Sequence, residues 1–163
     1  MSTSSRTEWI DGWTVERPAQ IGYVAVGAEE GIWGSWPQGG LEVRDLGLSE
    51  ASGGRISAHH VRSLGTETGL GEWHCYDLDF EFFYVIKGSI ALENQEGEVK
   101  EFGPGDSGYH PGLYWHREHF LSADLDVVRI TAPADDRRID GRDSPLPARA
   151  GTLPADRTGV YTR

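Results

Sequence analysis

The stretch WHCYDLDFEFFYVIKG, residues 73–88, constrains the fold of this chain more than any other part of it. Its segment FEFFYVI is aromatic or β-branched with a single acid inside, a pattern that favours a strand buried on both faces. The acid is Glu81, and a carboxylate in such a strand costs free energy unless it is ion-paired or bound to a metal. The residues leave two interpretations open: an ion pair with an arginine such as Arg117 or Arg129, or a cation that Glu81 shares with His74.

A second stretch, FGPGDSGYHPGLYWHRE at residues 102–118, supplies further candidate ligands. GPGD is typical of a turn, and a short strand over 107–110 ends before a proline. His116 then opens the next strand, with Glu118 and Phe120 on the same face by alternation. If the two stretches pair as antiparallel strands, two imidazoles and one carboxylate converge, which is a ligand set for a divalent transition metal. The predicted metal ligands are His74, Glu81 and His116.

The two stretches resemble the motifs of the cupin superfamily, G-x5-H-x-H-x3,4-E-x6-G and G-x5-P-x-G-x2-H-x3-N. The first motif matches at His74, Glu81 and Gly88, and the second at Gly105, Pro111 and His116. Residues 73–88 are also similar to the WHxHDxDFQFxYVLKG pattern of a sub-group of small single-domain cupins, and the resemblance covers residues 41–133. Three positions depart from the motifs: Tyr76 replaces the second histidine, Gly112 comes one place early, and Phe120 replaces the asparagine.

The resemblance implies an all-β, cupin-type double-stranded β-helix (jelly-roll) barrel with extended N-terminal strands and an irregular C-terminal tail. We expect an N-terminal arm and strands over 1–40, the barrel over 41–133 and the tail over 134–163. The predicted strands cover residues 21–26, 41–48, 55–64, 80–86, 89–94, 99–102, 107–110 and 125–131, with another that begins at His116, and no amphipathic helix is predicted. Related small cupins are usually homodimers, and an outward-facing row of Phe82, Tyr84 and Ile86 fits a buried interface.

Composition limits the classes of partner. The formal net charge of −11 disfavours nucleic acid, which is bound by basic surfaces. The single cysteine leaves no intrachain disulfide, and no apolar run reaches the length of a membrane span. The N-terminus has no signal-peptide core, so we expect a cytoplasmic protein with a small-molecule substrate, no nucleic-acid partner and no membrane partner.

Tyr76 and Glu118 are the predicted catalytic residues. Tyr76 has three open roles: a phenolate ligand, an acid/base group whose pKa falls beside a cation, or a filler of the space left by an imidazole in a site without metal. Some cupin lyases use a tyrosine near the metal to take a proton, so the resemblance implies the acid/base role. Glu118 can orient a ligating histidine or face solvent. His60 is an additional candidate ligand, because His59 or His60 must point inward in an alternating strand.

These residues predict a metal-dependent cupin enzyme that acts on a small organic molecule. We expect iron first, with zinc, nickel or manganese as alternatives, and oxygenase chemistry at the open coordination positions. A redox-neutral isomerase, cyclase or lyase that uses Tyr76 as acid or base is the second hypothesis. The third is a small-molecule binding module with a degenerate metal site.

Overall fold

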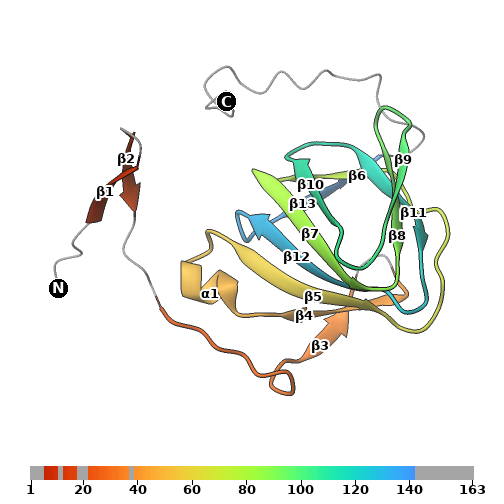
Figure 1. The fold of residues 1–163 in the computed structure, drawn as a ribbon, viewed down its shortest axis with the longest axis horizontal. Helices are drawn as coiled ribbons and strands as arrows, with labels where there is room; N and C mark the ends of the chain where they lie inside the picture. The colour runs from red at the N-terminus through yellow and green to blue at the C-terminus, as the bar shows by residue number, and fades with distance from the viewer. Residues whose placement is uncertain (1–5, 11–12, 18–21, 37–38, 142–163) are drawn as a thin grey trace.

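The computed structural model of the chain describes residues 6–10, 13–17, 22–36 and 39–141. Two short strands near the N-terminus, β1 (Arg6–Ile10) and β2 (Trp13–Arg17), form an antiparallel pair that is described by its backbone only. All other strands belong to two larger antiparallel sheets, which Figure 1 shows wrapped around one interior. The predicted all-β jelly-roll barrel is thereby confirmed.

The six-stranded sheet has the order β10-β7-β12-β5-β4-β3. Its strands are β3 (Trp33–Ser35), β4 (Leu41–Asp45), β5 (Ser57–Ser63), β7 (Phe80–Lys87), β10 (Ser107–Pro111) and β12 (Asp126–Ala132). The aromatic strand predicted in the organising stretch is β7, which pairs with β10 on one side and β12 on the other. Its inward residues Phe83 and Val85 are buried, but Tyr84 and Ile86 on its outer face are 45% and 48% exposed, so the expected burial on both faces is wrong.

The five-stranded sheet has the order β13-β6-β11-β8-β9. Its strands are β6 (His74–Asp77), β8 (Ile90–Asn94), β9 (Val99–Phe102), β11 (His116–Leu121) and β13 (Arg137–Asp140). One short helix, α1 (Leu48–Ser52), connects β4 to β5, where the sequence predicted no helix. The two second-motif strands therefore lie in different sheets, β10 in one and β11 in the other.

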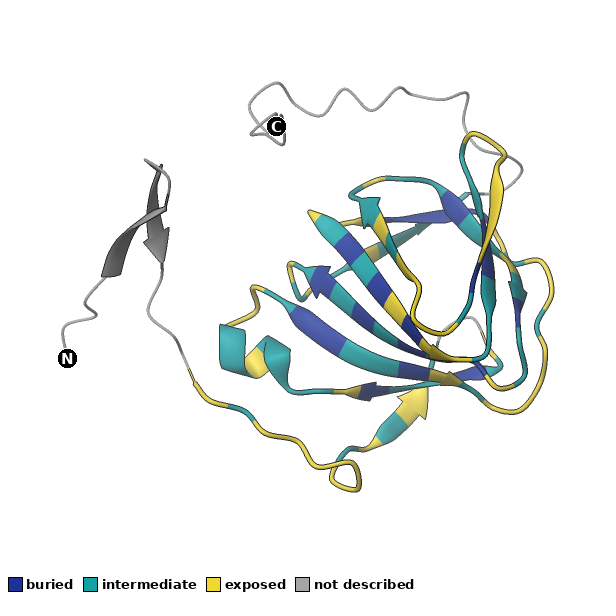
Figure 2. Cartoon of the chain, viewed as in Figure 1, coloured by how far each residue is buried: buried dark blue, intermediate teal, exposed yellow. Residues whose placement is uncertain are grey.

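The hydrophobic core fills one part of the space between the sheets, and buried residues alternate along the central strands in Figure 2. Its members come from both sheets: Leu41, Val61, Phe83, Val85, Leu92, Phe102, Leu121, Leu125 and Val127. Three bulky side chains on its edge, Trp36, Val43 and Ile90, pack against it. The same inward faces continue beyond the core into polar residues, and there the candidate site lies.

Several sequence predictions need correction. The predicted strand over 21–26 does not form, since residues 22–26 have no regular structure. The predicted irregular tail over 134–163 begins with an ordered strand, because β13 pairs with β6 in the register Ile139 to Cys75. Strict alternation along the strand predicts that Phe120 points inward. The pairing of β11 with β8 shifts between Glu118 and Phe120, so Leu121 points into the core instead. Residues 142–163 lie outside the described part of the chain.

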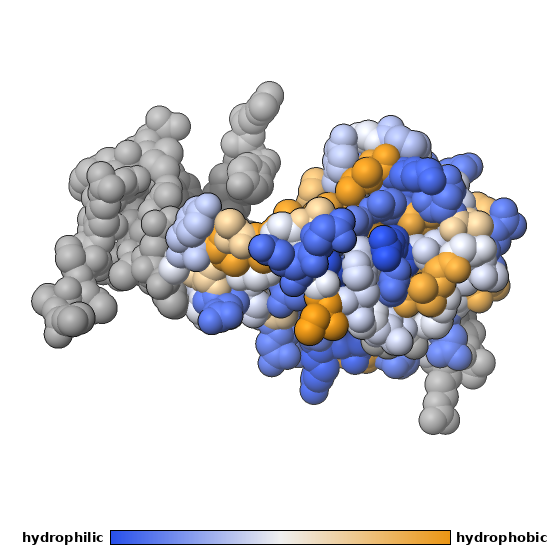
Figure 3. Space-filling model, turned by 90° about the horizontal axis from the view of Figure 1, so that it is seen from below, coloured by the Kyte–Doolittle hydropathy of each residue, from blue (hydrophilic) through white to orange (hydrophobic). Residues whose placement is uncertain are grey.

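The surface seen in Figure 3 is largely hydrophilic, and its hydrophobic side chains form small, separate groups. Among the described residues, no helix has both the length and the apolar character needed to span a bilayer.

Candidate metal centre

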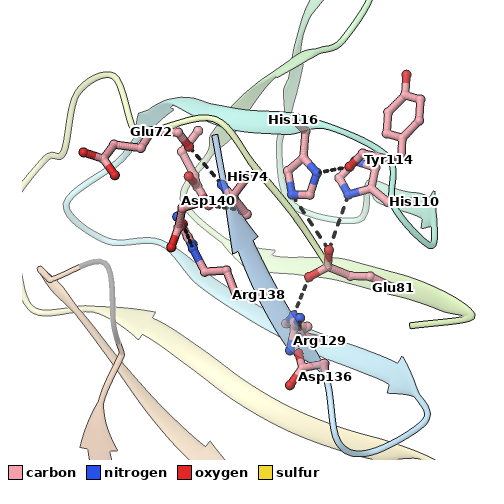
Figure 4. A network of polar contacts seen from close by, with 11 residues as sticks. Glu72, His74, Glu81, His110, Tyr114, His116, Arg129, Asp136, Arg138 and Asp140 are labelled. Carbon is pink, nitrogen blue, oxygen red and sulfur yellow. Dashed lines mark hydrogen bonds and ion pairs between the residues drawn. The ribbon is translucent and has the colours of Figure 1, made fainter. Parts of the chain in front are cut away.

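Four side chains from the two sheets meet at one end of the core. Glu81 on β7 lies directly opposite His110 on β10. His116, the first residue of β11, lies directly opposite His74 on β6. Figure 4 shows His116 and His110 converging on the Glu81 carboxylate, with His74 nearby. The convergence that the sequence predicted for His74, Glu81 and His116 therefore includes a further imidazole, that of His110.

The atoms that could ligate a cation come from Glu81, His110 and His116, which lie within 4.8 Å of one another. Glu81 Oε2 is 3.5 Å from His110 Nδ1 and 3.9 Å from His116 Nε2. Two ligands about 2.1 Å from one metal, at a tetrahedral angle, lie about 3.4 Å apart. The three side chains thus fit a divalent metal with little movement.

The His116 and His74 rings are held in one tautomer by the backbone. His116 Nδ1 lies 3.0 Å from the Tyr114 carbonyl and His74 Nδ1 lies 2.9 Å from the Glu72 carbonyl. A carbonyl only accepts hydrogen bonds, so each Nδ1 carries the proton and each Nε2 keeps its lone pair. Burial lowers the pKa of His74 to about 4 and that of His116 to about 3, so both rings are neutral at pH 7. Neutral imidazoles with a free Nε2 are the form that binds metals.

Glu81 is also ion-paired with Arg129 on β12. Its Oε1 accepts a hydrogen bond from Arg129 Nε, while Oε2 faces the imidazoles. Burial alone would raise the pKa of Glu81, but Arg129, assisted by His110 and His116, outweighs burial and lowers that pKa. Arg129 pairs in turn with Asp136, at 2.6 Å. Of the two partners considered from sequence, Arg129 is the one found, and Arg117 pairs with Glu93 at 2.6 Å.

Tyr76 lies between the imidazoles and Arg129. Its ring centroid is 5.4 Å from that of His74 and 6.2 Å from that of His116, and the Arg129 guanidinium lies 4.7 Å from it. Burial raises the pKa of Tyr76, and the nearby Arg129 does not reverse that shift. The phenol therefore keeps its proton at neutral pH in the protein alone, and the fall in pKa expected beside a cation stays a prediction.

Glu118, the other predicted catalytic residue, faces the same interior. Its Oε1 is 3.7 Å from His74 Nε2, and its side chain is 14% exposed. Burial raises the pKa of Glu118, which makes the ionised carboxylate a stronger base. Glu118 thus lies on the Nε2 side of the His74 ring and is partly exposed, and its predicted roles stay predictions.

His60 lies away from this cluster. Its Nε2 bonds to Asp126, and its Nδ1 lies 3.5 Å from an Arg44 nitrogen. The Trp33 ring covers it, with centroids 5.1 Å apart. His59, next to it, is opposite Arg129 in the ladder and therefore shares the inward face with that residue. His110 on β10, and not His60, supplies a further imidazole at the cluster.

An inner cavity of about 70 Å³ joins these groups to the core. Its polar lining includes His74, Tyr76, Glu81, His110, His116, Glu118 and Arg129. The apolar part of the wall includes Trp36, Phe83 and Leu121. The site can therefore present a metal, a phenol and a carboxyl to the reacting part of a small molecule.

No family model matches the chain, and no curated protein sequence matches it. Solved structures do, at low sequence identity. An RmlC-like cupin from Shewanella frigidimarina is 20% identical over 71% of this chain and 95% of its own, with a TM-score of 0.55. The polyketide cyclase RemF from Streptomyces resistomycificus is 17% identical over 76% of this chain and 89% of its own, with a TM-score of 0.59.

Pac13 from Streptomyces, described as a nucleoside dehydratase and also solved with uridine, is 15% identical to the chain. The match covers 77% of this chain and all of Pac13, with a TM-score of 0.55. At these identities the likeness shows a shared fold, and it extends over almost the whole length of each neighbour.

Proposed function

For this chain, which has the cupin fold, we propose a metal-dependent enzyme that acts on a small organic molecule by redox-neutral proton transfer. The reaction class is isomerisation, cyclisation or elimination. The observation that carries the proposal is the Glu81, His110 and His116 cluster beside a cavity lined by two ionisable groups, Tyr76 and Glu118. Two fold neighbours, a polyketide cyclase and a nucleoside dehydratase, are named for conversions of this class.

The proposed ligands are Glu81 through Oε2, His116 through Nε2 and His110, with His74 as a fourth. His74 belongs to the set because its ring lies 4.4 Å from that of His116 and its Nε2 keeps a lone pair. Zinc, nickel, manganese and iron all accept imidazole and carboxylate ligands. The bound metal would act as a Lewis acid that polarises an oxygen of the substrate.

Tyr76 and Glu118 would move the protons. We assign to Glu118 the removal of a proton from the substrate, because burial raises its pKa and so strengthens the carboxylate as a base. Tyr76 would give a proton to a substrate oxygen, because burial keeps the phenol neutral. That oxygen is the leaving group in an elimination, or the oxygen that becomes negatively charged in an isomerisation or cyclisation. Arg129 holds the unused oxygen of Glu81 and lies over the Tyr76 ring, so it would position both groups.

The test is a screen of small hydroxylated and carbonyl compounds in deuterated water with metal-loaded protein, followed by NMR. The proposal expects deuterium incorporation or product formation without oxygen consumption. Tyr76→Phe and Glu118→Gln should each lower turnover about 100-fold or more, the usual contribution of one acid or base, while metal content stays at the wild-type level. Unchanged turnover in both variants would refute these roles.

An oxygenase remains the second candidate, since two histidines and one carboxylate are also the ligands of non-haem iron(II) oxygenases. Iron in the purified protein together with oxygen uptake in the presence of a substrate would favour it over the redox-neutral reaction. A protein that binds small molecules but no metal would instead be the binding module, with Arg129 serving as the permanent cation beside Glu81.

We also propose that the chain forms a homodimer through the outer face of β7. Tyr84 and Ile86 are 45% and 48% exposed there, and Phe82 lies in the same row. Tyr109 on the neighbouring β10 adds a further exposed aromatic ring. Sedimentation of the wild type as a dimer and of Ile86→Lys as a monomer would support this interface, whereas a monomeric wild type would refute it.

A further inference from the structure

A second, larger hollow adjoins the candidate metal centre, and nothing in the proposed chemistry uses it. Its volume is about 640 Å³. The segment Thr68 to Glu72 forms one wall, and Arg138 and Asp140 of β13 contribute to another. The remaining lining residues are Gly39, Glu118 and Leu121.

The inner cavity alone is too small for a substrate of ordinary size. Pockets that bind drug-sized molecules measure about 300–1,000 Å³, far more than the cavity of about 70 Å³ beside the imidazoles. Glu118 and Leu121 line both spaces, so the hollow and the cavity meet at the carboxyl that we assign to proton transfer. A molecule seated in the hollow could thus extend its reacting end towards the metal centre.

The wall of the hollow is held in place by backbone hydrogen bonds. Thr68 and Leu121 exchange two, at 3.1 and 3.0 Å, and the Gly71 amide donates to the Glu118 carbonyl at 2.7 Å. The segment therefore continues the five-stranded sheet beside β11, and the hollow is built on ordered backbone. Figure 4 shows Arg138 and Asp140 on the His74 side of the centre.

Two buried polar atoms on the lining residues have no hydrogen-bond partner among the residues that the structure describes. They are Thr68 Oγ1 and Arg138 Nη1. Arg138 Nε is already bonded to Asp140, at 2.6 Å, which fixes the guanidinium. Buried polar atoms are nearly always satisfied in native proteins, so the unmatched hydroxyl and N–H leave two hydrogen bonds to be made at this wall once a side chain turns towards the hollow.

The charge of the lining indicates what kind of ligand this is. Glu72, Glu118 and Asp140 outnumber the single cation Arg138, which is itself paired with Asp140. The whole chain carries a formal charge of −11. An anionic molecule would therefore be repelled, whereas carboxylates, a hydroxyl and an N–H are suitable partners for several alcohol groups.

We propose that the hollow formed by Thr68, Gly69, Gly71, Arg138 and Asp140 binds the hydroxyl-rich, uncharged part of the substrate, of the sugar or polyol class. The inference rests on the proposed function in that the substrate's other end reaches Glu118 and the metal centre. It assigns specificity to Thr68 and Arg138, which lie outside the cupin motifs matched by the sequence.

The experiment is an NMR titration of isotope-labelled, full-length protein with two matched sets of probes. One set is uncharged (glucose, ribose and glycerol), and the other carries a carboxylate (glucuronate, ribonate and glycerate). We expect the uncharged probes to shift the amide signals of Thr68, Gly69 and Gly71. No shift with any uncharged probe, or equal shifts with the carboxylate set, would overturn the proposal.

Two variant pairs locate the binding. Thr68→Val should weaken binding about tenfold, as expected for one lost hydrogen bond, whereas Thr66→Val in the same segment should not change it. Gly69→Leu should narrow the hollow, since a Cβ there meets no atom within 4 Å and the new side chain can be accommodated. Gly103→Leu, at an equally open position outside the hollow, is its control. Wild-type affinity in both Thr68→Val and Gly69→Leu would refute the assigned location.

The outcome is separable from that of the proposed function. Metal content is measured on the same samples and should be equal in all four variants. Sugar binding at the hollow in a protein that holds no metal would leave this inference standing and overturn the metal-dependent enzyme. Bound metal with no response to the uncharged probes would overturn this inference and leave the metal-dependent enzyme standing.

Discussion

Glu81 is a buried carboxylate with a fixed cation on one oxygen and imidazoles facing the other. The two interpretations open at the sequence level, an arginine pair and a metal ligand, are thus compatible in one residue. A single ion pair satisfies only part of a carboxylate, which has about four lone-pair sites. The arrangement leaves Oε2 available for a metal while Arg129 stabilises the protein in its absence.

Replacing Arg129 by methionine tests this division of roles. Arg129→Met removes the cation but keeps most of the volume, so the metal-free protein should lose about 3 kcal/mol of its free energy of unfolding, as for other broken buried pairs. Added zinc or manganese should restore part of the loss, because the metal supplies a new positive charge beside Glu81. Urea unfolding with and without metal measures both effects.

Arg117→Met is the matched control, since Arg117 pairs with Glu93 nearer the surface and 22% of its side chain is exposed. We expect a loss of about 1 kcal/mol or less there and no recovery with metal. A similar metal response in both variants would show that the recovery has nothing to do with Glu81.

At the residue scale the sequence identified most of the site but omitted His110. The cupin-like motifs predict His74, Glu81 and His116 as ligands, whereas the cluster of potential ligand atoms comprises Glu81, His110 and His116, and the motif position of His110 carries no ligand. The signal that could have found it is the register: a strand over 107–110 that pairs with β7 brings an alternating inward residue opposite Glu81. His60 was included by alternation within its own strand, which cannot tell the inner face of a sheet from the outer one.

At the element scale, the pairing of β10 with β7 decides whether His110 reaches the cluster. Gly108, two residues before His110 on the same face, lies against the Phe83 ring, and a Cβ there would be 2.3 Å from two ring atoms. The absence of a side chain at this position therefore allows β10 to approach β7 in the observed register.

Gly108→Ala should push β10 away from β7. We expect a loss of about 1–3 kcal/mol of unfolding free energy from overpacking, together with weaker metal binding because His110 moves with the strand. Gly103→Ala, where a Cβ meets nothing within 4 Å, should change neither quantity. Calorimetric metal titrations and thermal unfolding of the two variants provide the comparison, and equal metal affinity in both would contradict the role of the register.

The barrel strands were largely predictable because their periodicity and turn residues are local signals. The prediction of strands over 89–94 and 99–102 matches β8 and β9 to within one residue. The strand β13 was not predictable in this way, since RRID is short, mostly charged and preceded by turn-forming residues. Its pairing with β6 depends on backbone hydrogen bonds to a distant strand, and composition does not report those.

At the scale of the whole molecule, the buried imidazoles couple stability to pH. Burial lowers the pKa of His74 to about 4 and that of His116 to about 3 in the folded protein, against about 6.5 for a free imidazole. The unfolded chain therefore binds more protons below pH 6.5, so acid favours unfolding. Each imidazole should remove about 2 kcal/mol of stability between pH 7 and pH 5. Glu118 offsets part of this, because burial raises its pKa.

Urea unfolding of chelator-treated protein at pH 7 and pH 5 measures how much the free energy of unfolding changes between the two pH values. His119→Ala, which removes an imidazole outside the buried cluster with 49% of its side chain exposed, is the control. Equal stability at the two pH values would mean that His74 and His116 are not held neutral in the folded state.

The fold prediction from two short motifs is confirmed for the barrel as a whole, while the site rests on side chains that three-dimensional pairing brings together. The N-terminal arm expected over residues 1–40 is described only in part, because residues 1–5, 11–12, 18–21 and 37–38 lie outside the described residues. A direct measurement of bound metal is accordingly the sharpest test of this site.

That measurement is elemental analysis of untagged wild-type protein beside His110→Ala and His119→Ala, all grown with supplemented iron, zinc, nickel and manganese. We predict close to one metal per chain in the wild type and in His119→Ala, and loss of that metal in His110→Ala with the fold retained by circular dichroism. A wild type without metal, or a His110→Ala protein with full metal content, would contradict a centre built from Glu81, His110 and His116.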